Sequence, residues 1–453
     1  MSRFRPLDRN TDFLLQPSVQ DWLPPEHLAR YVVDVVDQLD LAKLETAYAG
    51  KGSQAYHPAM LLALLIYGYA NSVFSSRKLE RATYDSLAFR FIACNQHPDH
   101  DTLATFRRRF TTEFAEVFVQ VLQVARENQF SKFGTVSLDG TKIHANASRH
   151  RALSYAYAEK IEAQLKAEVQ ELLQLAERAD QTSAPDGMSI PEELTRREDR
   201  LDAIVRAKTQ IEARAKERFE REQAEYESKL KKRQEKEEAT GKKPRGEAPK
   251  PPQEGPLPTD QISLTDEESR IMPVAGGGFD QCYNAQALVD TTSMLVMVPH
   301  VTQAPNDKQQ IEPVLVKLQA LPEGLNAPAV LLADCGYSSE KNADMCQAAG
   351  IEPLLALRRE HHHPHFTERF SEPTEAPAAT ASALEKMTHK LATRDGRALY
   401  ALRKQTVEPV FGMIKSVLGF RQFLTRGLKA VQGEWTLVCL AWNLKRMGVL
   451  RLK

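Results

Sequence analysis

Hydrophobic residues follow three different patterns along the chain, and these patterns divide it into regions. Up to about residue 130, apolar positions recur at helical spacing, and a strongly apolar run at 58–71 begins with a proline suited to a first helical turn. Across 156–262, apolar positions at helical spacing stand among charged residues, and a Pro-rich stretch follows. This second pattern predicts an antiparallel helical hairpin, whose second helix spans about 191–238, and then a linker.

From residue 263 onward, short apolar runs alternate with amphipathic ones, which is typical of an α/β domain. The runs at 277–290 and 293–303 predict two strands, interpreted as a hairpin. A helix is expected at 307–321, a buried strand at 327–334, another short strand at 352–359, and helices from about 390 to 450. The predicted segments are therefore 1–130, 131–155, 156–262 and 263–453, with the α/β part interrupted by the helical hairpin.

Composition excludes several classes of protein. The chain has 453 residues, and 60 basic residues balance 60 acidic ones, so net charge indicates no partner. No apolar run is long enough for a transmembrane helix, and the first residues lack the apolar core of a signal peptide. The five cysteines are scattered without a CxxC pair, which favours a reduced, cytoplasmic protein.

A cluster of three arginines lies near the end of the N-terminal region. The segment 97–110 reads as a helix capped by Asp99 or Asp101, and its second and third turns contain Arg107, Arg108 and Arg109. Several short helices that end in such a cluster suit a helix-turn-helix-like contact with DNA. A solvated helical face is an equally good interpretation of the same residues.

Two aspartates each follow an apolar strand. Asp139 comes after 135–138 and directly before Gly140, and Asp334 comes after 329–333. If the strands are parallel neighbours, both carboxylates lie at the same sheet edge, where like charges need a cation. Either residue alone is equally well explained as turn chemistry.

A third acid, Glu408, lies in a late helical run with basic residues around it. Arg403 and Lys404 precede it, and Lys415 follows two turns later. From residue 403 to the end there are ten Lys/Arg against two Asp/Glu, a balance that suits a nucleic-acid backbone. Three oxygen ligands without His or Cys favour Mg²⁺ or Mn²⁺ over zinc. The histidine-rich tract at 361–365 is interpreted as a solvated loop.

Taken together, these motifs resemble the bacterial insertion-sequence transposases of the DDE type. Asp139 in LDGTKIHANAS and Asp334 in ADCGY match the two aspartates of that family, and Glu408 matches its glutamate. Tyr400, Arg403, Glu408 and Lys415 fill a Tyr–Arg–Glu–Lys signature, in which either Arg403 or Lys404 takes the basic place. The segments 97–110, 265–272 and 279–290 are also similar to this branch, so the resemblance covers nearly the whole chain.

The resemblance implies a ribonuclease-H-like catalytic core: a mixed sheet flanked by helices, interrupted by the hairpin and preceded by an all-α DNA-binding region. It implies two Mg²⁺ or Mn²⁺ ions between Asp139, Asp334 and Glu408, and DNA cleavage followed by transfer of the 3′ ends to target DNA. Its implied partners are double-stranded transposon ends, target DNA and a second copy of the chain.

The resemblance also indicates roles for residues around the three acids. Arg403, Lys404 and Lys415 would hold phosphates, and Tyr337 and Tyr400 would either contact DNA or pack in the core. Asn284 and Gln286, on one strand face, would support the acids or contact DNA, and Trp435 and Trp442 are expected in the core. A nuclease of the same fold and a catalytically silent DNA-binding relative remain the alternatives.

Overall fold

The computed structural model describes residues 18–48, 54–148, 152–178, 189–241, 246–357, 376–378 and 381–452. The histidine-rich tract therefore lies outside the described residues. The chain forms two compact units: Met1–Ile143 together with Asn284–Lys453, and His144–Tyr283. No helix among the described residues is long and apolar enough to cross a membrane.

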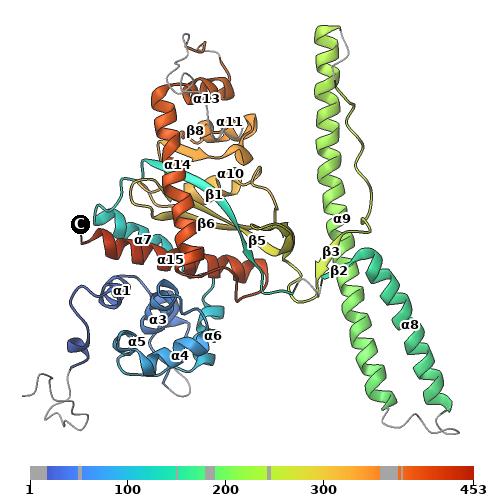
Figure 1. Cartoon of the computed structure of the whole chain (residues 1–453), viewed down its shortest axis with the longest axis horizontal. Helices are drawn as coiled ribbons and strands as arrows, with labels where there is room; N and C mark the ends of the chain where they lie inside the picture. Colours follow the sequence, from blue (N-terminus) through green and yellow to red (C-terminus); the bar gives the residue numbers. More distant parts are fainter. Residues whose placement is uncertain are drawn as a thin grey trace, which may run out of the picture. The chain divides into compact units, whose positions relative to one another are not determined.

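The first unit begins with short helices (Figure 1). They are η1 (Val19–Trp22), α1 (Leu28–Val36), α2 (Ala42–Thr46), α3 (Pro58–Ala70), α4 (Ser76–Asp85), α5 (Leu87–Ile92), α6 (His100–Arg109) and α7 (Phe114–Glu127). The predicted proline start of α3 is confirmed, and eleven of its thirteen residues are buried. A helix that is apolar on all sides must be surrounded, and α1, α4, α5, α6 and α15 (Leu428–Leu450) all contact α3.

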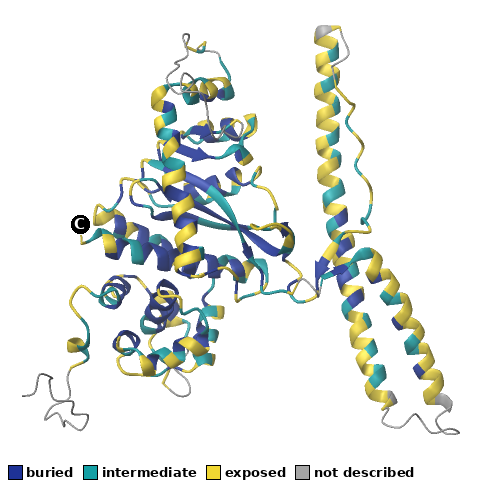
Figure 2. Ribbon diagram, in the orientation of Figure 1, coloured by how far each residue is buried: buried dark blue, intermediate teal, exposed yellow. Residues whose placement is uncertain are grey.

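A mixed sheet follows, and most of it belongs to this unit, whereas β4 and the residues of β5 up to Tyr283 are counted with the second unit. Its strands are β1 (Thr135–His144), β4 (Arg270–Pro273), β5 (Phe279–Asp290), β6 (Val296–Thr302), β7 (Val330–Ala333) and β8 (Glu352–Leu355). Their order is β4-β5-β1-β7-β8, and β6 also pairs with β5. The predicted β5–β6 hairpin is confirmed as antiparallel, and β1, β7 and β8 are parallel neighbours. Figure 2 shows these strands as largely buried.

Helices flank the sheet, as the sequence predicted. They are α10 (Ile311–Gln319), α11 (Glu340–Ala348), α13 (Ala383–Ala392), α14 (Arg394–Gly412) with a π-helical continuation at Met413–Val417, and α15. The expected core position of Trp435 and Trp442 is confirmed, since both are buried in α15. Their indole N–H groups donate to the backbone oxygens of Gln286 and Met294, each at 2.9 Å.

Helix α15 also covers the β6 strand. The side chain of Asn443 exchanges two 2.8 Å hydrogen bonds with the backbone of Val296, and Gln432 Oε1 accepts one from the Val301 N–H. These backbone groups lie on the outer strand of the hairpin, where unpaired groups would otherwise be a site for association with another strand. Helix α15 therefore fixes the position of the β5–β6 hairpin.

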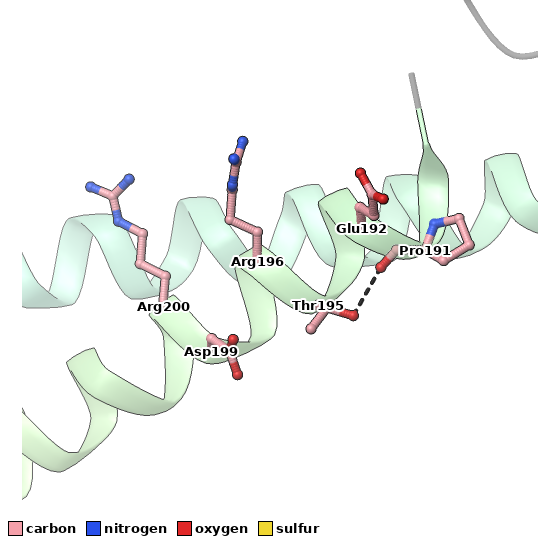
Figure 3. Close-up of a pocket in the computed structure, with 6 residues that line it drawn as sticks. All are labelled: Pro191, Glu192, Thr195, Arg196, Asp199 and Arg200. Atoms are coloured by element: carbon pink, nitrogen blue, oxygen red, sulfur yellow. Dashed lines mark hydrogen bonds between the residues drawn. The ribbon is translucent and has the colours of Figure 1, made fainter. Parts of the chain in front are cut away.

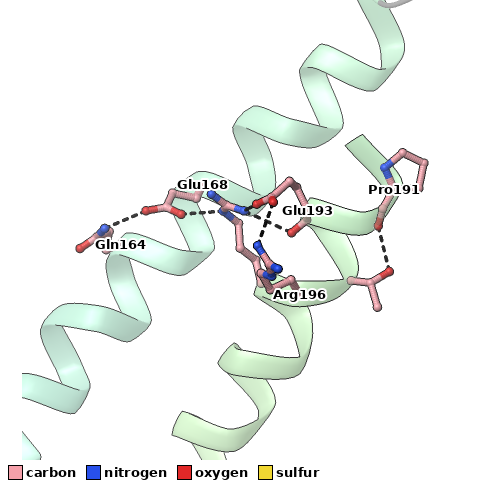
Figure 4. A network of polar contacts seen from close by, with 7 residues as sticks. Gln164, Glu168, Pro191, Glu193 and Arg196 are labelled. Atoms are coloured by element: carbon pink, nitrogen blue, oxygen red, sulfur yellow. Dashed lines mark hydrogen bonds and ion pairs between the residues drawn. The ribbon is translucent and has the colours of Figure 1, made fainter. Parts of the chain in front are cut away.

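The second unit contains the predicted pair of long helices, α8 (Tyr155–Arg178) and α9 (Ile190–Thr240), with the short strands β2 (Ala152–Ser154) and β3 (Gln261–Ser263). Lys208 pairs with Glu162 and Arg197 with Glu168, so the two helices run antiparallel. Figure 4 shows the polar contacts near the Glu168 end, where Gln164 also donates to Glu168 at 2.7 Å. A small apolar cluster that includes Leu165 and Ile204 packs between them.

Candidate active site

The register of two parallel strands brings the first two predicted acids together. Leu138 of β1 is paired with Ala333 of β7, so Asp139 and Asp334 are the next residues on neighbouring strands. The expectation that Asp139 ends its strand is wrong, because β1 continues to His144. Asp334 does leave its strand, and its side chain accepts a 2.8 Å hydrogen bond from the Gly336 N–H.

Arg403 connects the third acid to the first. Its guanidinium donates to Asp139 Oδ2 at 3.2 Å and to Glu408 Oε1 at 2.9 Å, and its side chain is only 11 % exposed. Arg403 and Glu408 lie on α14, whereas Asp139 lies on β1. The Arg403 side chain therefore joins two of the three acids, although β1 and α14 are far apart in sequence.

Lys415 contacts the same strand from the π-helical segment. Its ammonium donates to Thr141 Oγ1 at 3.0 Å and to the backbone oxygen of Lys142 at 3.2 Å. A π-helical stretch contains an extra residue per turn and is often found at functional sites. Two of the predicted basic residues, Arg403 and Lys415, thus reach β1, while Lys404 is exposed on α14.

The electrostatics of Asp139 reflect this setting. Burial raises the pKa of its carboxyl from 3.8 to about 7, against the lowering effects of the Gly140 N–H and Arg403, and Asp334 and Asp307 raise it further. A carboxyl with such a pKa lacks positive charge around its ionised form. Arg403 supplies part of that charge in this structure.

Two family models match the chain. A transposase domain (DUF772) matches residues 17–109, and a transposase DDE domain matches residues 273–444. The second match contains Asp334, Arg403 and Glu408. The chain belongs to the insertion-sequence DDE transposases. No curated protein and no solved structure gave a significant match.

As a member of this family, the transposase is a DNA-binding enzyme of transposition, and such enzymes use divalent metal ions. The described residues contain no group of three or more His, Cys, Asp or Glu side chains already arranged around one point. The donor chemistry nevertheless fits: Asp139, Asp334 and Glu408 offer only oxygen, which suits Mg²⁺ or Mn²⁺. The guanidinium of Arg403 bridges Asp139 and Glu408, so these two carboxylates already share a positively charged partner.

A fourth acid, Asp307, was missed by the sequence reasoning. Its Oδ1 accepts hydrogen bonds from Asn284 Nδ2 at 2.7 Å and from Gln286 Nε2 at 2.6 Å. The sequence signal was the polar pair Asn284 and Gln286 among the apolar residues at the middle of the strand, since buried amides need partners. Their expected shared strand face is confirmed by this common partner.

Gly140 leaves room for the same network, which a larger residue would displace. A Cβ atom at this position would lie 2.2 Å from Gln286 Nε2, 2.7 Å from Asp307 Oδ1 and 2.8 Å from Asn284 Oδ1. All three distances are shorter than real Cβ contacts. The residue after Asp139 therefore allows the polar side chains of β5 to approach β1 closely.

The two predicted tyrosines are both buried. Tyr337 is fully buried and its hydroxyl donates to Gln286 Oε1. Tyr400 is 8 % exposed and packs with Val330, Leu332 and Leu354. Of the two roles left open by the sequence, this structure supports packing, and contact with DNA stays a prediction.

The arginines of α6 are not equivalent. Arg107 donates to the Tyr69 hydroxyl at 2.9 Å and to the Phe74 backbone oxygen at 3.0 Å, so its side chain is directed into the helical region. Arg109 lies over the rings of Tyr48 and Phe110. Arg108 is exposed and contacts Thr105 of its own helix. The helix is capped by Asp99, as predicted.

The second unit has a hollow on its described surface. It lies on α9 and is lined by Pro191, Glu192, Thr195, Arg196, Asp199 and Arg200 (Figure 3). None of the predicted site residues belongs to it. Its lining comes from the first turns of a charged helix, so it is a surface groove of the hairpin rather than a candidate active site.

Proposed function

We propose that this transposase cleaves DNA at the ends of its element with bound Mg²⁺ or Mn²⁺ and joins the 3′ ends to target DNA. The observation that supports this most directly is the β1–β7 register, which makes Asp139 and Asp334 neighbours. Glu408 is tied to the same place through Arg403. The sheet order, in which two parallel strands lie beside β1 on the side away from the β5–β6 hairpin, supports a ribonuclease-H-like core.

Two bond exchanges at phosphorus make up the reaction. Water attacks the phosphate at the element end, a new P–O bond forms, and the bond to the departing 3′ oxygen breaks to leave a 3′-hydroxyl. That hydroxyl then attacks a phosphate of the target, and the target strand leaves with its own 3′-hydroxyl. The bound ions supply charge for the attacking and departing oxygens.

The residues of the chain position these groups. Asp139, Asp334 and Glu408 would hold the ions, and Asp139 would do so in its ionised form. Arg403 then exchanges a carboxylate partner for a phosphate oxygen, for which its planar guanidinium is suited. Lys415, fixed against Thr141 and Lys142, adds a second positive charge beside β1.

The remaining proposals concern partners and location. We propose that α6 contributes to DNA binding through Arg108, with Arg107 and Arg109 supporting its position. Synapsis of two ends requires two copies of the chain, so a dimer is expected on DNA. A bacterial cytoplasmic location, with association to the nucleoid through DNA, follows from this function.

The test uses the full chain and a labelled duplex that carries the end of the element. With Mg²⁺, we expect a nick at the boundary of the element. When the duplex is supplied already cut at that boundary and target DNA is added, we expect a joined product. A nick without joining favours the nuclease alternative. Asp139→Asn is expected to abolish cleavage and keep the mobility shift on the same duplex, whereas absence of cleavage by the unaltered chain favours the catalytically silent relative.

A further inference from the structure

Asp307 lies in the loop between β6 and α10 and turns its carboxylate toward the backbone that carries the predicted acids. A Cβ atom on Gly140, which follows Asp139, would be 2.7 Å from Asp307 Oδ1. A Cβ atom on Gly336, two residues after Asp334, would be 3.9 Å from Asp307 Cβ. Asp307 is thus next to both aspartate-bearing segments, and it is among the charges that raise the pKa of Asp139.

Two fully buried amides hold this carboxylate in place. Asn284 and Gln286 are 0 % exposed, and both donate to Oδ1 of Asp307. Lys142 Nζ lies 4.0 Å from the same oxygen. Because these contacts all involve Oδ1, the second oxygen, Oδ2, is available for another ligand, and the Asp307 side chain is 23 % exposed.

A second observation points to a ligand independently. The Oδ1 atom of Asn284 is buried and has no hydrogen-bond partner among the described residues. It lies 2.8 Å from the point where a Gly140 Cβ would be, so it faces the same space as Asp307 Oδ1. An orphaned buried acceptor costs about 1–3 kcal/mol unless something binds it.

The orientation of the Asn284 amide follows from its partners. Its Nδ2 group donates to Asp307 Oδ1 at 2.7 Å and to the Ala304 backbone oxygen at 3.2 Å, both of which are acceptors only. Exchanging the amide N and O would face oxygen with oxygen at both contacts. The unpartnered atom is therefore an oxygen, and it is the kind of donor that binds Mg²⁺ or Mn²⁺.

We propose that Asp307 is a fourth carboxylate ligand of the transposase metal centre, that the amide N–H groups of Asn284 and Gln286 hold it there, and that Asn284 Oδ1 faces the same cation. The site would take a divalent cation that prefers oxygen ligands. This inference rests on the proposed metal-dependent function and adds a ligand beyond Asp139, Asp334 and Glu408.

The test measures Mn²⁺ binding to the full chain by calorimetry and by the loss of the free-ion electron paramagnetic resonance signal. Asp307→Asn keeps the shape of the side chain, and we expect it to weaken Mn²⁺ binding about 10-fold or more, or to remove one bound ion. The matched control is Glu312→Gln, an exposed acid on α10 that pairs with Lys341. It should bind Mn²⁺ as the unaltered chain does.

A second variant tests direct contact with the metal. Asp307→Cys replaces the oxygen ligand by a thiol, which favours soft ions. Because the unaltered chain already has free cysteines, of which Cys94 is exposed and Cys335 follows Asp334, the result that counts is a thiolate–cadmium absorbance band that Asp307→Cys adds to the spectrum of the unaltered chain at the same Cd²⁺ concentration. A residue with only a structural role would not create that band. Wild-type-like Mn²⁺ binding by Asp307→Asn, or absence of the band, would overturn the proposal.

Asp139→Asn separates this proposal from the proposed function. If Asp139→Asn weakens Mn²⁺ binding and Asp307→Asn does not, the metal centre exists and Asp307 is not part of it. If the unaltered chain binds no Mn²⁺, both proposals fail together. A variant that has lost its fold is recognised by comparing its urea unfolding in EDTA with that of the unaltered chain. In that case the cadmium measurement on Asp307→Cys decides whether Asp307 contacts the metal.

Discussion

The raised pKa of Asp139 makes a quantitative prediction for the metal-free protein. In the unfolded chain this carboxyl ionises near 3.8, and in the folded chain its pKa is about 7. The folded state therefore binds more protons between these values, and its stability falls as pH rises from about 4 through 7. Asp139→Asn removes this penalty, because a neutral amide of the same shape replaces the buried charge.

The size of the effect follows from the two pKa values. A change from 3.8 to about 7 corresponds to about 4 kcal/mol at a pH above both. The side chain is 20 % exposed, so some solvent reaches it and we expect a gain of about 2–4 kcal/mol for Asp139→Asn at pH 8. Near pH 4 the two proteins should be almost equally stable, because Asp139 is then protonated in the folded state.

Urea unfolding in EDTA, measured at intervals from pH 4 to pH 8, tests this directly. The control is Asp344→Asn, an exposed residue on α11, which should change little across the same range. Saturating Mg²⁺ should reverse the ranking at pH 8, since the unaltered chain gains binding energy that the variant cannot. If Asp139→Asn is no more stable than the unaltered chain at pH 8 in EDTA, the electrostatic account of the site is wrong.

Three further predictions concern single side chains. Gly140→Ala should abolish cleavage and lower the stability of the fold, because the new Cβ would lie 2.2 Å from Gln286 Nε2. Its control is Gly134→Ala, which has open space around its Cβ and should leave the nicking rate and the urea midpoint unchanged. Glu434→Gln should lower the free energy of unfolding by about 3 kcal/mol in urea titrations, because this buried carboxylate accepts several hydrogen bonds. Lys415→Met should slow single-turnover nicking about 10-fold with little change in the mobility shift, and an unchanged rate would remove Lys415 from the site.

Local patterns predicted the elements that place the acids. The apolar run before Asp334 and the run that ends at Asp290 are signals that depend on a strand's own residues, and both strands are present. Parallel pairing of β1 with β7 was the inference that joined Asp139 to Asp334, and it is confirmed. It was stated as a condition, because either aspartate alone is equally well explained as part of a turn.

Tertiary contacts explain what the sequence did not predict. Asp139–Gly140 resembles a turn, yet β1 continues through it because Gly140 admits the amides of Asn284 and Gln286. Asp307 has no sequence pattern of its own, because only its hydrogen bonds to those two amides identify it as a residue of the site. The choice between Arg403 and Lys404 likewise depended on which of them faces β1, and Arg403 is the one that pairs with Asp139.

Helix α15 explains why Arg107 is directed inward. Glu434 accepts a 2.9 Å hydrogen bond from the Tyr69 hydroxyl, which in turn accepts one from Arg107. The next residue, Trp435, donates to the backbone oxygen of Gln286, whose side chain holds Asp307. Successive residues of one buried helix thus contact the N-terminal helices and the strand behind the acids. Packed contacts of this kind resist displacement, and they explain why α6 and the strand behind the acids belong to one compact unit.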